Sequence, residues 1–150
     1  MKLPALNHVL EYEHPAVLKL YNQNYPNNTL SASCAFLEMK KYLWLAQKHA
    51  LDRQKNPADP RLPERFFMVR GMQEIDEMWH EFILFTADYM RFCETYFGEY
   101  LHHLPNLFDN RPRPRADVER DIAKMLPYIH EHLGEESVRI WFAHYLNVQA

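Results

Sequence analysis

The segment MQEIDEMWHEFIL, residues 72–84, decides the fold class because its apolar residues recur at helical spacing. At 100° per residue, the predicted core face holds Met72, Ile75, Met78, Trp79, Phe82 and Ile83. The opposite arc is polar and holds Gln73, Glu74, Glu77 and Glu81. Asp76 and His80 lie between the two arcs, one turn apart, where we expect both side chains to be half-buried.

Helical spacing also dominates the chain on both sides of this segment. It predicts helices over residues 15–25, 31–51, 87–97, 116–134 and 135–147. We expect Ser31 or Ser33 to cap the second of these and Thr86 to cap the third, with Gly98 ending the latter. Pro127 predicts a kink or break, because proline lacks the amide donor that a helical turn needs. The prediction is an all-α fold, with residues 1–150 forming a single compact domain of five to six helices in an irregular bundle.

The composition favours an ordinary globular protein and excludes several functional classes. The chain has 150 residues, 47% hydrophobic and 25% charged, with a net charge of −3, so it has no basic field for nucleic acid or an anionic membrane. Its two cysteines, Cys34 and Cys93, lie far apart, which argues against a disulfide framework or a thiolate zinc site. The first residues lack the apolar core of a signal peptide, and we expect a cytoplasmic protein without membrane spans. A protein partner or a small molecule is compatible with this composition, which does not define the oligomeric state.

Two histidine-containing segments raise the possibility of a metal site. Asp76 and His80 can approach one ligand because they are one helical turn apart. His102 and His103 follow the next predicted helix, and a helical hairpin of this length can return one of them to His80. The predicted centre is a mononuclear zinc or iron site with a position left for water, and Tyr89 and Glu77 are candidates for proton transfer or for supporting the ligands.

Two other interpretations of the same residues stay open. Asp76 and His80 can form a simple hydrogen-bonded pair, and the chain would then be a non-enzymatic interaction or accessory module with histidines as buried structural pins. The pairs Glu77–His80 and Glu99–His102 also match the Glu-x-x-His spacing of di-iron bundles. Glu77 lies on the polar arc and Glu99 follows the helix-ending glycine, and both positions disfavour a di-iron site.

The remaining histidines and Cys93 have simpler interpretations. His130 and His132 suit the last turn of a helix, and His144 is expected to pack in the core, although it could reach a site. Spacing suggests no partner for His8, His14 or His49. Cys93 lies on an apolar stripe and is interpreted as a small hydrophobic residue. No nucleophile elbow or phosphate-binding glycine loop is found, so an enzymatic activity is undecided.

Residues 75–105, IDEMWHEFILFTADYMRFCETYFGEYLHHLP, resemble the central motif of the glycine-rich domain-containing protein-like family. The motif's positions fall on Asp76, Trp79, His80, Leu84, Tyr89, Gly98 and His103, and EMKKYLWLAQ upstream is similar to the family's preceding helix. The resemblance implies a helical fold, points to Asp76, His80 and His103, and implies no established reaction. The family often has a second histidine two residues after the first; here that position is Phe82, which would remove a ligand if that histidine is one.

Overall fold

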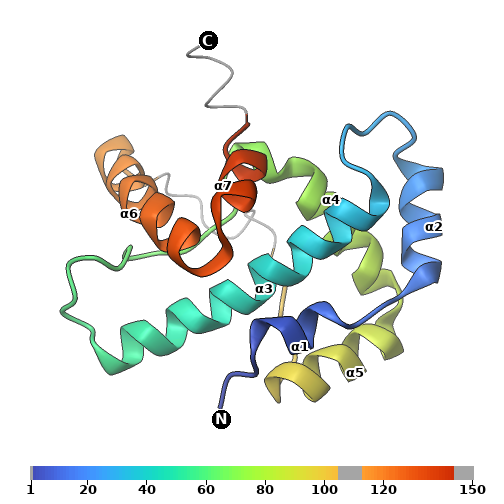
Figure 1. Cartoon of the computed structure of the whole chain (residues 1–150), viewed down its shortest axis with the longest axis horizontal. Coiled ribbons are helices and arrows are strands. Elements are labelled where there is room, and N and C mark those ends of the chain that lie inside the picture. Colours follow the sequence, from blue (N-terminus) through green and yellow to red (C-terminus); the bar gives the residue numbers. More distant parts are fainter. Residues whose placement is uncertain (1, 105–112, 144–150) are drawn as a thin grey trace.

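The computed structural model describes residues 2–104 and 113–143, and all regular structure in these ranges is helical. The helices are α1 (Leu6–Leu10), α2 (Pro15–Asn24), α3 (Ala32–Lys55), the 3-10 turn η1 (Arg70–Met72), α4 (Gln73–Leu84), α5 (Thr86–Phe97), α6 (Arg115–Leu133) and α7 (Glu135–Trp141). The predicted all-α class is confirmed, and the five-residue α1 is an addition to the predicted helices. Figure 1 shows the long α3 crossing the middle of the molecule with the other helices around it.

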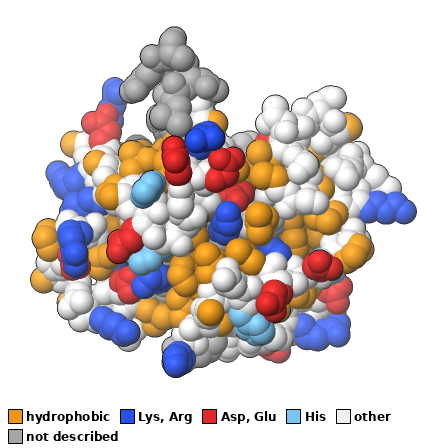
Figure 2. Space-filling model, in the orientation of Figure 1, with side chains coloured by type: hydrophobic (Ala, Val, Ile, Leu, Met, Phe, Trp, Pro, Cys, Tyr) orange, Lys and Arg blue, Asp and Glu red, His pale blue; other side chains and the backbone are white. Residues whose placement is uncertain are grey.

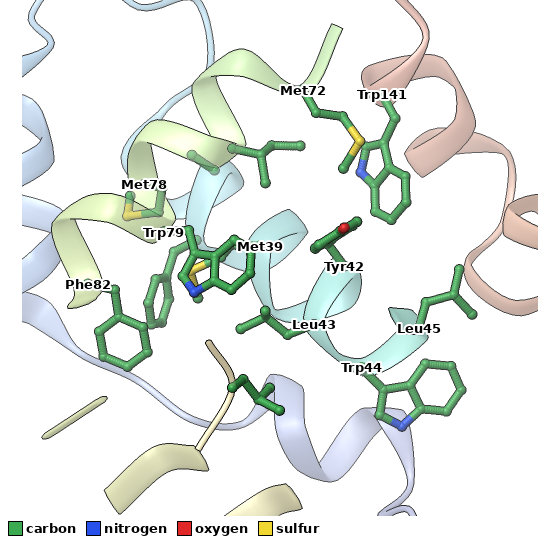
Figure 3. Close-up of a cluster of buried hydrophobic side chains, with 14 of the residues drawn as sticks. Met39, Tyr42, Leu43, Trp44, Leu45, Met72, Met78, Trp79, Phe82 and Trp141 are labelled. Atoms are coloured by element: carbon green, nitrogen blue, oxygen red, sulfur yellow. The ribbon is translucent and has the colours of Figure 1, made fainter. Parts of the chain in front are cut away.

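Helix α3 is the centre of the packing. It begins after Ser31, whose hydroxyl accepts a hydrogen bond from the Cys34 amide at 3.1 Å, so the first of the two predicted caps is the one used. Figure 3 shows side chains from α3, α4 and α7 meeting in the core, with Tyr42 and Trp79 among them. Helix α3 also extends to Lys55, beyond the predicted end, which shortens the proline-containing connector before α4.

Helices α4 and α5 form the predicted hairpin, with two departures in detail. Gly98 ends α5 in the left-handed conformation (φ 74°), as expected for a residue without Cβ. Thr86 was wrongly predicted as the cap: it is the first residue of α5, and Phe85 precedes it without a side-chain capping bond. The apolar stripe on which Cys93 was placed is confirmed: Cys93 is buried together with Tyr89, Phe92 and Phe97 of the same helix.

The glutamates of α4 do not face open solvent, contrary to the polar arc that helical periodicity predicts. Glu81 is 5% exposed and accepts a hydrogen bond from Asn24 at 3.0 Å. Glu74 accepts a hydrogen bond from the Leu30 amide at 2.7 Å and thereby holds the connector between α2 and α3. Helix α4 is therefore covered on its polar side as well as on its core side. The polar side is covered by α2 and by the connector after it, which are distant from α4 in the sequence.

Pro127 does not break α6, which was one of the two outcomes predicted for it. The helix runs without interruption from Arg115 to Leu133. Both Pro127 and Ala123, whose carbonyl loses its usual helical partner, are exposed at the surface. Water can therefore satisfy that carbonyl, and the helix continues.

The buried carboxylate of Glu38 joins α3 to α7. It is 1% exposed and accepts hydrogen bonds from the Ser137 hydroxyl at 2.7 Å and the Trp141 indole at 3.0 Å. Lys41 lies 2.9 Å from its second oxygen and supplies a compensating charge. This network satisfies a charge that would otherwise be costly to bury.

His132 near the end of α6 should make the fold sensitive to mild acid. Burial and the Lys48 charge lower the pKa of His132 from its ordinary 6.5, outweighing Glu131 and Asp52. Between the folded and unfolded pKa values the unfolded chain binds more protons, so stability should fall as pH decreases below about 6.5. Urea unfolding between pH 7.5 and 5.5 should show a smaller loss for His132→Asn than for the wild type. His130→Asn, at an exposed position of the same helix, should keep the wild-type loss; equal profiles for all three proteins would contradict this assignment.

The surface carries mixed charges. Figure 2 shows acidic and basic side chains interspersed with hydrophobic ones on the face drawn. Within the described ranges, none of the helices combines the length and the apolar character that crossing a bilayer requires.

Candidate metal centre

Asp76, His80 and His103 come together at one end of the α4–α5 hairpin. Each offers one potential ligand atom, and these atoms all lie within 4.8 Å of one another. His103 Nε2 lies 2.6 Å from Asp76 Oδ1, and His80 Nε2 lies 3.5 Å from Asp76 Oδ2. Asp76 is thus the shared partner of both imidazoles.

The two histidines differ in how firmly they are held. The His103 ring stacks on Trp79 with centroids 3.9 Å apart and an interplanar angle of 12°. Its side chain is 18% exposed, whereas that of His80 is 53% exposed, more than the half-buried position that was predicted. His80 stacks on the outer side of His103 at 4.6 Å, so His103 is fixed between two rings and His80 faces solvent.

The segment after α5 brings His103 to the site because Tyr89 anchors it. The Tyr89 hydroxyl accepts a hydrogen bond from the Trp79 indole at 2.9 Å and donates one to the Leu101 carbonyl at 2.6 Å. Burial raises the pKa of Tyr89, so the phenol keeps the proton that it donates. Tyr89 therefore positions Trp79 and the chain that carries His103, which is the supporting role among the two named for it.

Removing the Tyr89 hydroxyl should loosen this arrangement. Tyr89→Phe leaves the Trp79 indole and the Leu101 carbonyl without their shared partner, and should lower the free energy of unfolding by about 1–3 kcal/mol. Urea denaturation followed by circular dichroism measures the change. Tyr100→Phe is the matched control, because the Tyr100 side chain is exposed and its hydroxyl bonds to no described residue; it should change stability by less than about 0.5 kcal/mol. Equal effects of the two substitutions would contradict the anchoring role.

The environment of Asp76 favours its charged form. Burial raises the pKa of Asp76, but the hydrogen bond from His103 and the charges of His80 and His103 together lower it more. The carboxyl pKa is therefore below its ordinary value. A carboxylate held ionised beside two imidazoles suits a divalent cation.

These three residues lie on the wall of a cavity of about 780 Å³. Its apolar and aromatic wall includes Tyr42, Phe66, Val69, Met72 and Trp79, and its polar wall includes Arg65, Arg70 and Gln73. The size is that of a typical small-molecule site. A ligand in this cavity would therefore lie next to Asp76, His80 and His103.

Other predicted site residues are not part of this group. His102 lines the cavity, but its ring packs against Tyr100 at 4.8 Å and its side chain is exposed. Glu77 accepts a hydrogen bond from Asn28 at 3.2 Å, toward the connector after α2, and Glu99 is exposed. Asp76, His80 and His103 form the one group of three or more potential ligands found among the described residues, and it lacks both glutamates of the di-iron alternative.

The donor set fits one ion after a small rearrangement. Two ligand atoms about 2.1 Å from a tetrahedral ion lie about 3.4 Å apart, which the Asp76–His80 separation already matches. The Asp76–His103 hydrogen bond would lengthen and His103 Nε2 would lose its proton. One ion cannot lie in the planes of two stacked rings, so the His80 ring must turn, which its exposed position permits.

Two histidines without apparent partners in the sequence are structural. His14 Nε2 lies 2.8 Å from Asp88, and its other ring nitrogen accepts a hydrogen bond from the Val17 amide as the cap of α2. His49 Nε2 lies 2.7 Å from the Pro63 carbonyl. Pro15 at the first helical position is a recognisable start signal for α2, although histidine is not a common cap, and the partner of His49 depends on tertiary packing. His144 lies outside the described residues.

Comparison with known proteins corrects the predicted family. Residues 60–122 match a family model described as UCP032817-like. This finding overturns the expected resemblance to the glycine-rich domain-containing protein-like family, which was wrong. The match includes Asp76, His80 and His103 but spans less than half of the chain, and its description names no reaction. No curated protein and no solved structure matches the chain.

Phe82 does not leave a gap in the candidate centre. It is 0% exposed and packs against aromatic rings of the core, including Phe36 and Tyr89. It does not line the cavity with Asp76 and His80. A histidine at this helix position would face the core and not the three ligands.

Proposed function

We propose that the chain is a metal-binding protein in which Asp76, His80 and His103 hold one zinc or iron ion at the cavity wall. The observation that carries this proposal is the convergence of two imidazoles and one carboxylate beside a cavity of about 780 Å³. Two histidines and a carboxylate are donors found in both catalytic zinc and non-haem iron sites. The free cysteines Cys34 and Cys93 fit the reduced cytoplasmic setting that we expect.

The chemistry of such a site follows from its incomplete protein coordination. A bound divalent ion would supply Lewis acidity and an acidified water at the position that protein ligands leave open. Asp76 contributes negative charge, Trp79 orients His103 by stacking, and His80 faces solvent. His102 lies on the same cavity wall and is a candidate to contact a ligand there.

Metal content is the direct test. Tag-free protein, expressed with zinc or with iron and handled without oxygen for iron, should contain about one equivalent by mass spectrometry. Zn²⁺ or Fe²⁺ added to stripped protein should raise its melting temperature, because a ligand that binds only the folded state stabilises it. No stoichiometric metal and no thermal shift with either ion would refute the proposal.

A second candidate function rests on the hydrogen bond that His103 already makes. With Asp76 at 2.6 Å and Trp79 stacked on its ring, His103 is a well-satisfied structural residue without any ion. In that case the chain is a helical interaction or accessory module. Metal would then change neither stability nor structure, and His103→Ala would still destabilise the protein.

A further inference from the structure

The cavity beside the candidate centre has two arginines with no evident structural task. Arg65 and Arg70 line it, and both are exposed. Neither guanidinium makes a hydrogen bond or an ion pair with a described residue. By contrast, Arg113 on the same wall lies 2.7 Å from the buried Asp121, in an ion pair without hydrogen-bond geometry. Among the described residues, Arg65 and Arg70 are thus the cations of the wall that have no partner.

The wall of the cavity offers a hydroxyl donor that has no hydrogen-bond partner among the described residues. Tyr42 is 7% exposed, and its hydroxyl makes no hydrogen bond to any described residue. Burial and the nearby Asp76 charge raise the pKa of Tyr42, so its hydroxyl stays protonated and able to donate. Because Tyr42 lines the cavity, its hydroxyl can donate a hydrogen bond to a ligand there.

The rest of the wall is suited to an apolar or aromatic group. The Phe66 ring stacks on Tyr42 with centroids 5.5 Å apart and an interplanar angle of 21°, and Trp79 lies 6.0 Å from Tyr42. The charged groups on the wall, apart from the histidines, are three arginines and the single carboxylate of Asp76. The cavity is therefore locally positive in a chain whose net charge is −3.

We propose that this cavity binds a small organic anion, a carboxylate or a phosphate monoester with an apolar body. Arg65 and Arg70 bind its charged group, Tyr42 donates to a polar atom, and Phe66 and Trp79 contact its body. Guanidinium groups suit this task because they form paired hydrogen bonds with carboxylates and phosphates. This inference rests on the proposed function in one respect: the anion is the class of substrate that the metal site would act on. Binding of the anion by the two arginines and Tyr42 does not require a metal ion.

Three probes of similar shape test the charge requirement. Benzoate and phenyl phosphate carry the two candidate anions on an aromatic body, and benzamide is the neutral control. Titrations of metal-stripped and zinc-loaded protein, followed by two-dimensional NMR, give a dissociation constant for each probe. We expect at least one anion to bind at least about tenfold more tightly than benzamide, which corresponds to one charge-assisted hydrogen bond. The preferred anion identifies the charged group of the ligand.

Variants assign the binding to the named residues. Arg65→Gln and Arg70→Gln should each weaken the preferred anion about tenfold, and Tyr42→Phe should weaken it about threefold to tenfold. Arg120→Gln is the control, because Arg120 is exposed and lies away from the cavity wall. Circular dichroism checks that each variant is folded.

The outcomes separate this inference from the proposed function. Anions that bind no more tightly than benzamide to a protein that holds metal would overturn the inference and leave the metal site standing. Arginine-dependent anion binding by a protein that never holds metal would support the inference and refute the metal site. Anion binding that requires zinc but is unchanged in both arginine variants would overturn the role of the arginines.

Discussion

His103→Ala should abolish stoichiometric metal binding and lower the affinity for zinc or iron at least about 100-fold. Loss of a residue that supports a ligand already costs 10–100-fold in affinity, and loss of a ligand should cost at least as much. His103 is also the best-held of the three candidate ligands, through Asp76 and Trp79. Metal content by mass spectrometry and zinc titration against a competing chelator measure the change.

The neighbouring histidines supply the controls for this prediction. His80→Ala should lose metal equally but keep the stability of the metal-free protein, because the His80 side chain is 53% exposed. His102→Ala changes an adjacent histidine outside the three-residue group and should keep its metal. If His102→Ala loses metal while His80→Ala keeps it, the assigned ligand set is wrong.

Glu38→Leu should lower the free energy of unfolding by about 3–5 kcal/mol, the largest effect on stability that we expect. The substitution removes the common acceptor of Ser137 and Trp141, both 0% exposed, and leaves Lys41 without its counter-charge. The reason for the large effect is that all three donors stay in place while the group that satisfies them is lost. Urea denaturation curves give the difference.

Two variants test whether the hydrogen bonds or the mere presence of a side chain matter. Glu38→Gln keeps the shape and one acceptor oxygen and should cost less, about 1–2 kcal/mol. Glu131→Leu replaces an exposed glutamate and should change stability by less than about 0.5 kcal/mol. A Glu38→Leu protein within 1 kcal/mol of the wild type would show that the network contributes little.

The core-facing sides of α4 and α5 were predictable because they depend on local periodicity. Ile75, Met78 and Phe82 are buried as their spacing indicates, and Gly98 ends α5 as its lack of a side chain suggests. The burial of Glu81 was not predictable from its own helix, because its partner Asn24 lies on α2. The predicted break at Pro127 does not occur, because the effect of a proline depends on whether the freed carbonyl can reach water.

The three candidate ligands were also predictable from local spacing. Asp76 and His80 are one turn apart on a single helix, and a hairpin explains the return of His103. The cavity was not predictable in this way. Its wall joins Tyr42, which lies on α3, to Arg65 and Arg70, which lie in the segment before α4, and tertiary packing brings them together. No local spacing links Tyr42 to Arg70, and sequence patterns alone do not reveal their common wall.

The unequal exposure of His80 and His103 has a consequence for how fast the proposed ion would exchange. A site closed by buried ligands on every side releases its ion only when part of the fold opens. Here rotation of a single surface side chain, His80, would leave the ion with two protein ligands and open to an acceptor. Surface rotamers change within picoseconds to nanoseconds. Loading and release should therefore be limited by the strength of the metal–ligand bonds, and stabilising the core should leave the exchange rate unchanged.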